Sequence, residues 1–148
     1  MDLDLSLAIA HHLLVFMLFG VLFVEAVLVR PGMDQVVINR VAAIDLWYGI
    51  IAGLIIIVGF SRAIFATKGW DYYLHNVFFW AKIGTFVVIA LLSVPPTIAY
   101  LRWKRANLTP NEGQIITIRR YLWSQFALFA LLPTFAAAMA RGYGLVGI

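Results

Sequence analysis

The sequence contains no cysteine, and this absence excludes several kinds of chemistry at once. A chain without thiols forms no disulfide, holds no iron–sulfur cluster or thiolate-bound zinc, and has no cysteine nucleophile. Its cysteine content therefore gives no information about the redox compartment. Nitrogen ligands are also few, since the only histidines are His11, His12 and His75.

Charged residues are the second shortage. They make up 12% of the chain, whereas 64% of its residues are hydrophobic, which leaves too little polar surface for a soluble domain. We therefore expect an integral membrane protein. The formal net charge of +4 comes from basic residues that are divided among the segments between apolar runs. It therefore indicates membrane topology and not nucleic-acid binding.

Four apolar runs are long enough to cross a bilayer, whose hydrocarbon core of about 30 Å needs about 20 helical residues. They are Leu5–Val29 and, with approximate ends, Ala42–Ala66, Val77–Leu101 and Tyr121–Ala140. The predicted fold class is all-α. The whole chain, residues 1–148, is expected to form one domain, a four-helix transmembrane bundle.

The distribution of Lys and Arg predicts how this bundle is oriented. Seven of them flank the connections between the first and second runs and between the third and fourth: Arg30, Arg40, Arg102, Lys104, Arg105, Arg119 and Arg120. The opposite side has three, Arg62, Lys68 and Arg141. By the positive-inside rule, both termini then lie on the outer, periplasmic side of a bacterial inner membrane.

Polar residues in two of the runs reach a similar depth from that outer side. His11 and His12 lie six and seven residues beyond Leu5, roughly 10 Å into the first run. Lys82 lies five residues beyond Val77 in the third run, which enters the membrane from the same side. An ionisable group inside a membrane segment is a functional hypothesis by default.

The histidine pair allows a structural and a functional interpretation. One histidine can pack between helices with a single hydrogen bond while the other extends toward water. Alternatively, one can ligate a metal, but adjacent helical residues point about 100° apart, so both cannot bind one metal from the same side. His12, the deeper residue, is the favoured axial ligand, with His11 as the alternative and His75 as a second ligand. A catalytic zinc site would need all three histidines to converge, which helical geometry resists.

The cationic residues on the outer side also have alternative roles. Lys82 can extend to the membrane surface along its alkyl chain, or it can attract an anionic ligand such as a carboxylate. Arg62 and Arg141 follow the second and fourth runs, where they are either topology anchors or ligand contacts.

Two further features lie away from the histidines and Lys82. Glu25 lies about 20 Å deeper in the first run than the histidines, and we expect it to pair with Arg30 or Arg40, with proton uptake as the alternative. Gly49 and Gly53 form a GxxxG pair, a pattern that lets another helix approach closely.

Two stretches of the chain resemble a known family. The first runs from His11-His12 through Gly20 to a basic end at Arg30. The second is Phe78-Phe79-Trp80-Ala81-Lys82, followed by an aliphatic run and a basic end at Arg102-Trp103-Lys104-Arg105. Together they resemble the small HemJ-type protoporphyrinogen IX oxidases and, more distantly, the CopD-like membrane domains of copper resistance. The chain looks closer still to an uncharacterised family of predicted bacterial membrane proteins.

The resemblance implies a heme b cofactor and assigns roles to individual residues. In the HemJ-type enzymes a helix-one histidine and a helix-three lysine matter for activity, and these match His11 or His12 and Lys82 here. Lys82, Arg62 and Arg141 would then pair with the propionates of the heme or porphyrin. The implied reaction removes hydrogens from a porphyrinogen and passes electrons to a quinone or a cytochrome.

A function of another class is that of an accessory subunit, which binds no cofactor and packs against a larger membrane complex or another copy of itself. The GxxxG pair, the small tail and the near absence of structure outside the membrane favour this interpretation. It predicts co-purification with partners and unchanged function when His11 and His12 are replaced by Ala.

Overall fold

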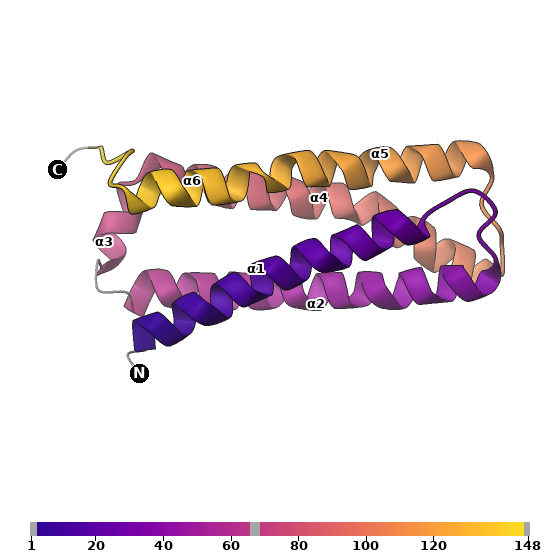
Figure 1. The fold of residues 1–148 in the computed structure, drawn as a ribbon, viewed down its shortest axis with the longest axis horizontal. Coiled ribbons are helices and arrows are strands. Elements are labelled where there is room, and N and C mark those ends of the chain that lie inside the picture. Colours follow the sequence, from indigo (N-terminus) through magenta and orange to yellow (C-terminus); the bar gives the residue numbers. More distant parts are fainter. Residues whose placement is uncertain (1–2, 66–68, 147–148) are drawn as a thin grey trace.

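The computed structural model describes residues 3–65 and 69–146, which form six α-helices (Figure 1). The helices are α1 (Leu3–Leu28), α2 (Gln35–Phe65), α3 (Gly69–Leu74), α4 (Val77–Ala106), α5 (Glu112–Phe129) and α6 (Leu131–Ala140). Four segments are long and apolar enough to cross a membrane, namely α1, α2, α4 and the continuous pair α5–α6. The prediction of an all-α bundle with four spans is therefore confirmed.

The helices extend beyond the apolar runs that predicted them. Helix α2 begins at Gln35 and not near Ala42, and α5 begins at Glu112 and not near Tyr121. An apolar run marks the thickness of the hydrocarbon layer, whereas helical hydrogen bonding continues into the polar region on either side. The predicted end of the second span, Ala66, lies outside the described residues.

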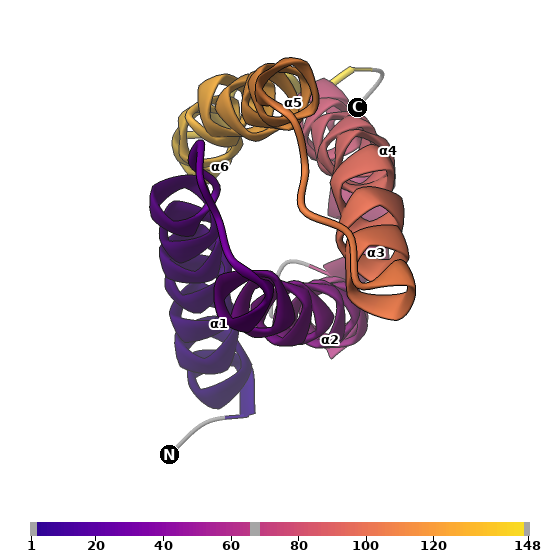
Figure 2. The ribbon, with the colours of Figure 1, turned by 90° about the vertical axis from the view of Figure 1, so that its right-hand side faces the viewer.

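The four spans are arranged in a ring, in the order α1, α2, α4 and α5–α6 (Figure 2). Four crossings put both termini at one end of the bundle, which we call the terminal end; the loops 29–34 and 107–111 form the opposite loop end (Figure 1). That the terminal end faces the outside of the cell stays a prediction from the distribution of basic residues.

Helix α1 crosses the ring at an angle. It packs against α5 near the middle of the bundle, where the ring centroid of Phe19 lies 5.3 Å from that of Phe126. Toward the terminal end α1 diverges from α6, and among the described residues no Cα atom of one helix lies within 8 Å of a Cα atom of the other (Figure 1). The ring is therefore closed by direct packing at the loop end and is held less closely at the terminal end.

The main core lies in the loop-end half. Its most buried members include Leu18, Leu22, Val29, Ile38, Val41, Tyr100, Trp103, Ile115 and Leu122. Large apolar side chains also cover the outside of the bundle, and Phe16, for example, is 71% exposed. An outer surface of this kind is suited to lipid, because lipid chains solvate apolar groups that water would exclude.

Proline explains the break in the fourth span. Pro133 has no N–H, so the carbonyl of Phe129, four residues earlier, cannot receive its usual helical hydrogen bond. The helix is interrupted there, with α5 ending at Phe129 and α6 beginning at Leu131. Helix α4, in contrast, continues through Pro95 and Pro96.

The terminal end is closed by a contact between the C-terminal segment and the start of α4. Asn76 is fully buried, and its side-chain oxygen accepts hydrogen bonds from the N–H groups of Phe78 and Phe79. Its side-chain amide donates to the carbonyl of Tyr143, and the N–H of Val77 donates to the carbonyl of Gly144. One side chain thus caps a helix and anchors a segment from the far end of the sequence.

We expect Gly144→Ala to destabilise the protein more than Gly142→Ala. Both glycines have a φ near +80°, so alanine costs about 1 to 2 kcal/mol of backbone strain at either position. Only at position 144 would the new methyl group lie 2.5 Å from Phe78 Cδ2, and overpacking adds about 1 to 3 kcal/mol. The free energy of unfolding of each variant is measured in mixed micelles. Equal losses of stability in the two variants would show that the tail does not pack against Phe78.

Candidate functional site

Three cationic or titratable side chains from three helices gather in the terminal-end half. They are His11 of α1, Arg62 of α2 and Lys82 of α4, and we call them the cationic cluster. Lys82 and Arg62 both act electrostatically on His11, and Arg62 acts on Lys82. The structure thus brings together residues that the sequence placed at a common depth.

His11 fits against α2 through a glycine. A Cβ atom at position 59 would lie 3.2 Å from His11 Cε1 and 3.5 Å from His11 Nδ1, so the imidazole occupies space that only Gly59 leaves open. The Nδ1 atom is buried and has no hydrogen-bond partner among the described residues. A buried nitrogen without a partner is an expensive arrangement unless a ligand or water completes it.

His12 faces the other way. Its side chain is exposed, and its Nδ1 lies 2.7 Å from the carbonyl oxygen of Ala8, one turn earlier on the same helix. The sequence favoured His12 as ligand because it lies deeper in the span. In the structure it is His11 that is turned toward the other helices, so the geometry favours His11 for any role inside the bundle.

The structure does not bring His75 or Arg141 to the cationic cluster. His75 follows α3 and is exposed, with its Nδ1 2.9 Å from the Asp71 carbonyl oxygen and 3.5 Å from the Asp71 carboxylate. Arg141 is an exposed residue that caps the C-terminus of α6. Within the described ranges, no three His, Cys, Asp or Glu side chains are arranged to hold a metal ion.

The cationic cluster has more positive than negative charge. Asp4 is its acidic neighbour, with Asp4 Oδ1 3.9 Å from Arg62 Nε. Lys82 Nζ lies 5.6 Å from the centre of the Phe79 ring, a cation–π contact that replaces only part of its hydration. Of the ion pairs formed by residues 3–65 and 69–146, none includes Lys82. The cluster is therefore suited to an anionic ligand.

Aromatic side chains lie next to Lys82. The Phe79 ring contacts those of Trp70 and Tyr73, with centroid separations of 6.2 and 5.4 Å. Tyr73 and Phe79 are buried, in a small apolar cluster that is separate from the main core. Cationic groups beside aromatic surface are suited to a ligand that is both anionic and planar.

A second polar group lies in the loop-end half, and part of it contradicts the sequence analysis. Glu25 was expected to pair with Arg30 or Arg40, but those side chains are exposed whereas Glu25 is 2% exposed and faces Asp45. The prediction was wrong because Glu25 follows Leu22 by three residues and shares its buried helix face.

Hydrogen bonds extend this second group across the bundle. Thr97 Oγ1 donates to Asp45 Oδ1 over 2.9 Å, and Tyr48 OH donates to Gln125 Oε1 over 2.9 Å. Sequence reasoning missed Thr97, Tyr48 and Gln125, because their partners are 52 or 77 residues away. The one available signal was Gln125, an amide inside the fourth apolar run.

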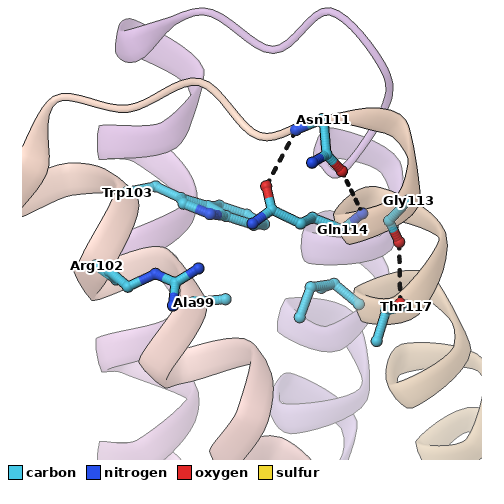
Figure 3. Close-up of a pocket in the computed structure, with 8 residues that line it drawn as sticks. Ala99, Arg102, Trp103, Asn111, Gly113, Gln114 and Thr117 are labelled. Atoms are coloured by element: carbon cyan, nitrogen blue, oxygen red, sulfur yellow. Dashed lines mark hydrogen bonds between the residues drawn. The ribbon is translucent and has the colours of Figure 1, made fainter.

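A pocket of about 330 Å³ opens at the loop end, where α4 meets the start of α5 (Figure 3). Asn111 and Gln114 exchange hydrogen bonds there and satisfy the first turn of α5. Thr117 donates to the carbonyl of Gly113. These polar groups already form hydrogen bonds at the start of α5, and Arg102 is the one charged side chain of the pocket lining. The pocket therefore offers few free polar groups for a ligand.

Comparison with known proteins identifies a family. A family model described as "Predicted membrane protein (DUF2214)" matches residues 3–144. No curated protein and no solved structure matches the chain.

The Tyr48–Gln125 hydrogen bond gives a prediction about stability. Tyr48→Phe removes the donor and leaves the Gln125 carbonyl buried with its lone pairs unused, so we expect a loss of about 1 to 2 kcal/mol. Tyr143→Phe is the matched control, because Tyr143 is 63% exposed, and its stability should be unchanged. Unfolding in mixed micelles compares the two; an unaltered Tyr48→Phe would mean that the hydrogen bond contributes nothing net.

Proposed function

We propose that this chain, which belongs to the DUF2214 family of predicted membrane proteins, binds a carboxylate-bearing tetrapyrrole, heme b or a porphyrin, in the terminal-end half of its membrane bundle. The observation that carries the proposal is the cationic cluster. It brings together His11, Arg62 and Lys82 from three membrane spans, and among the described residues only Asp4 forms an ion pair with the cluster. Charge in such a place needs an opposite charge to balance it.

The residues present fit heme b. His11 would hold the heme iron, because its imidazole is turned inward and its Nδ1 has no partner among the described residues. One imidazole nitrogen is enough to hold heme iron, which supplies one-electron redox chemistry when bound. Lys82 and Arg62 would pair with the two propionates. His12, His75 and Arg141 are left out, since they are exposed and point elsewhere.

The same site also fits a porphyrin as substrate. In that form of the proposal the protein is an oxidoreductase, and Lys82 is the catalytic residue that holds a substrate carboxylate beside the aromatic surface of Phe79. The electrons removed from the porphyrinogen would pass to a quinone or a cytochrome. By the positive-inside rule, the site is expected to lie in the outer half of a bacterial inner membrane.

A second candidate function is that of a cofactor-free accessory subunit. Gly49 and Gly53 are exposed, and a Cβ built on either would meet nothing within 4 Å. The GxxxG face of α2 is therefore not used to pack the described helices against one another and is available to another transmembrane helix. This candidate predicts co-purification of a partner, which Gly49→Leu should abolish.

An absorption spectrum separates the two candidates. We expect wild-type protein purified from heme-replete cells to show a Soret band, His11→Ala to lose it, and His12→Ala to keep it. His12 is the matched control, because it is the adjacent residue and makes its hydrogen bond within α1. A wild-type protein without a Soret band, or equal loss in the two variants, would contradict the assignment of His11.

Substitution of the cations should weaken porphyrin binding. A hydrogen bond to a charged group contributes about 1.5 to 3 kcal/mol, so Lys82→Met and Arg62→Gln should each raise the Kd for protoporphyrin IX by roughly 10-fold to 100-fold. Arg141→Gln should leave the Kd unchanged, because Arg141 lies outside the cationic cluster. Quenching of porphyrin fluorescence in detergent measures all three; identical affinities would remove the cations from the site.

A further inference from the structure

We propose that Glu25 and Asp45 form a buried carboxyl pair that binds and releases a proton. The pair lies in the loop-end half of the bundle and includes no member of the cationic cluster. The inference is therefore independent of tetrapyrrole binding, and either can fail without the other.

The two carboxyl groups come from adjacent helices and are both nearly inaccessible. Glu25 of α1 is 2% exposed and Asp45 of α2 is 7% exposed, and the two carboxyls are close enough to act on each other electrostatically. Residues on α2 and α4 complete the surroundings. Thr97 of α4 donates to Asp45, while the Tyr48 and Tyr100 hydroxyls lie within electrostatic range of both acids.

No basic side chain of residues 3–65 and 69–146 forms an ion pair with either acid. Arg119 of α5 is the cationic side chain that reaches the same region of α1, but its Nη1 donates to the carbonyls of Ala26 and Val29 over 3.1 and 2.7 Å. The ion pairs of the described residues join Asp4 to Arg62 and His75 to Asp71. Two neighbouring negative charges without a cation are prohibitively costly inside a membrane, and one shared proton removes one of them.

The contact between Glu25 and Tyr100 is also suited to a group that binds and releases a proton. The Glu25 carboxyl and the Tyr100 hydroxyl are close enough to act on each other, but Glu25 Oε1 and Tyr100 OH are both buried and make no hydrogen bond of good geometry with the described residues. Tyr100 is 1% exposed, so solvent cannot complete it from outside. A carboxylate can accept from this hydroxyl and a protonated carboxyl can also donate to it, so the contact can be completed in either protonation state.

A groove gives the pair a route for proton exchange. It has a volume of about 340 Å³ and lies between α2 and α4, where Asp45, Tyr48, Ser93 and Thr97 form its polar lining. Leu46 and Leu101 are among its apolar residues. Asp45 thus lies at the wall of the groove, whereas Glu25 is more deeply buried and is not among the residues that line it. This order suits a relay in which Asp45 exchanges the proton and Glu25 stores it.

Infrared titration of the purified protein tests the proposal. We expect wild-type protein to show a protonated-carboxyl C=O band at neutral pH that disappears in one step on alkalinisation, with a second, coupled step on acidification as the other carboxyl is protonated. Glu25→Gln and Asp45→Asn keep the shape of the side chains and should each leave a single step, and the double variant should lose the band. Glu112→Gln is the matched control, since Glu112 is exposed at the start of α5.

Several outcomes would overturn the proposal. A wild-type protein without the band at neutral pH would do so whether or not the variants fold, and so would a band that persists in the double variant. Titrations in sodium chloride and in choline chloride distinguish a bound proton from a bound metal cation. A midpoint that moves with the sodium concentration would assign the pair to a metal cation.

Discussion

The high cost of isolated charge inside a hydrocarbon layer is the constraint on which the polar interior of this protein depends. The bundle has few polar groups that could stabilise a buried charge, and its ionisable side chains are not scattered. They gather in two places of opposite sign: His11, Arg62 and Lys82 in the terminal-end half, and Glu25 with Asp45 in the loop-end half. Neither group is neutralised by the other, because they are at different depths. We therefore propose that each group binds something that the helices alone do not supply, an anion in one case and a proton in the other.

Helix α1 connects the two groups. His11 and Glu25 are fourteen residues apart, which is about 21 Å along a helix and nearly the same face. Because α1 crosses the ring at an angle, that face meets different neighbours along its length. Near His11 it lies against Gly59 of α2, and near Glu25 it lies in the closed part of the ring, against Asp45 and Tyr100. A proton released or taken up by redox chemistry at one end would thus have an acceptor further along the same helix.

Hydropathy was enough to predict four spans, because a membrane helix must bury its whole backbone and needs a long apolar run to do so. It did not predict that α5 begins at Glu112 or that Pro133 divides the fourth span. The matched depth of His11 and Lys82 followed from counting along helices that enter from the same side. The rotation of α1 about its own axis could not be predicted in this way, because it is set by packing partners such as Gly59. The sequence therefore favoured His12, whereas the structure turns His11 inward. Glu25 was assigned to arginines nearby in the sequence, although its spacing from Leu22 already placed it on the buried face. Its true neighbours come from other helices, and no local pattern reveals them.

The central claim is that unbalanced positive charge in the terminal-end half selects a carboxylate-bearing planar ligand. It is tested most directly by comparing two ligands on unaltered wild-type protein, protoporphyrin IX and its dimethyl ester, which has the same ring and no free carboxylates. The account predicts that the free acid binds at least about tenfold more tightly, a difference of about 1.4 kcal/mol, and that the difference shrinks as salt is added. Equal affinities for the acid and the ester would contradict it.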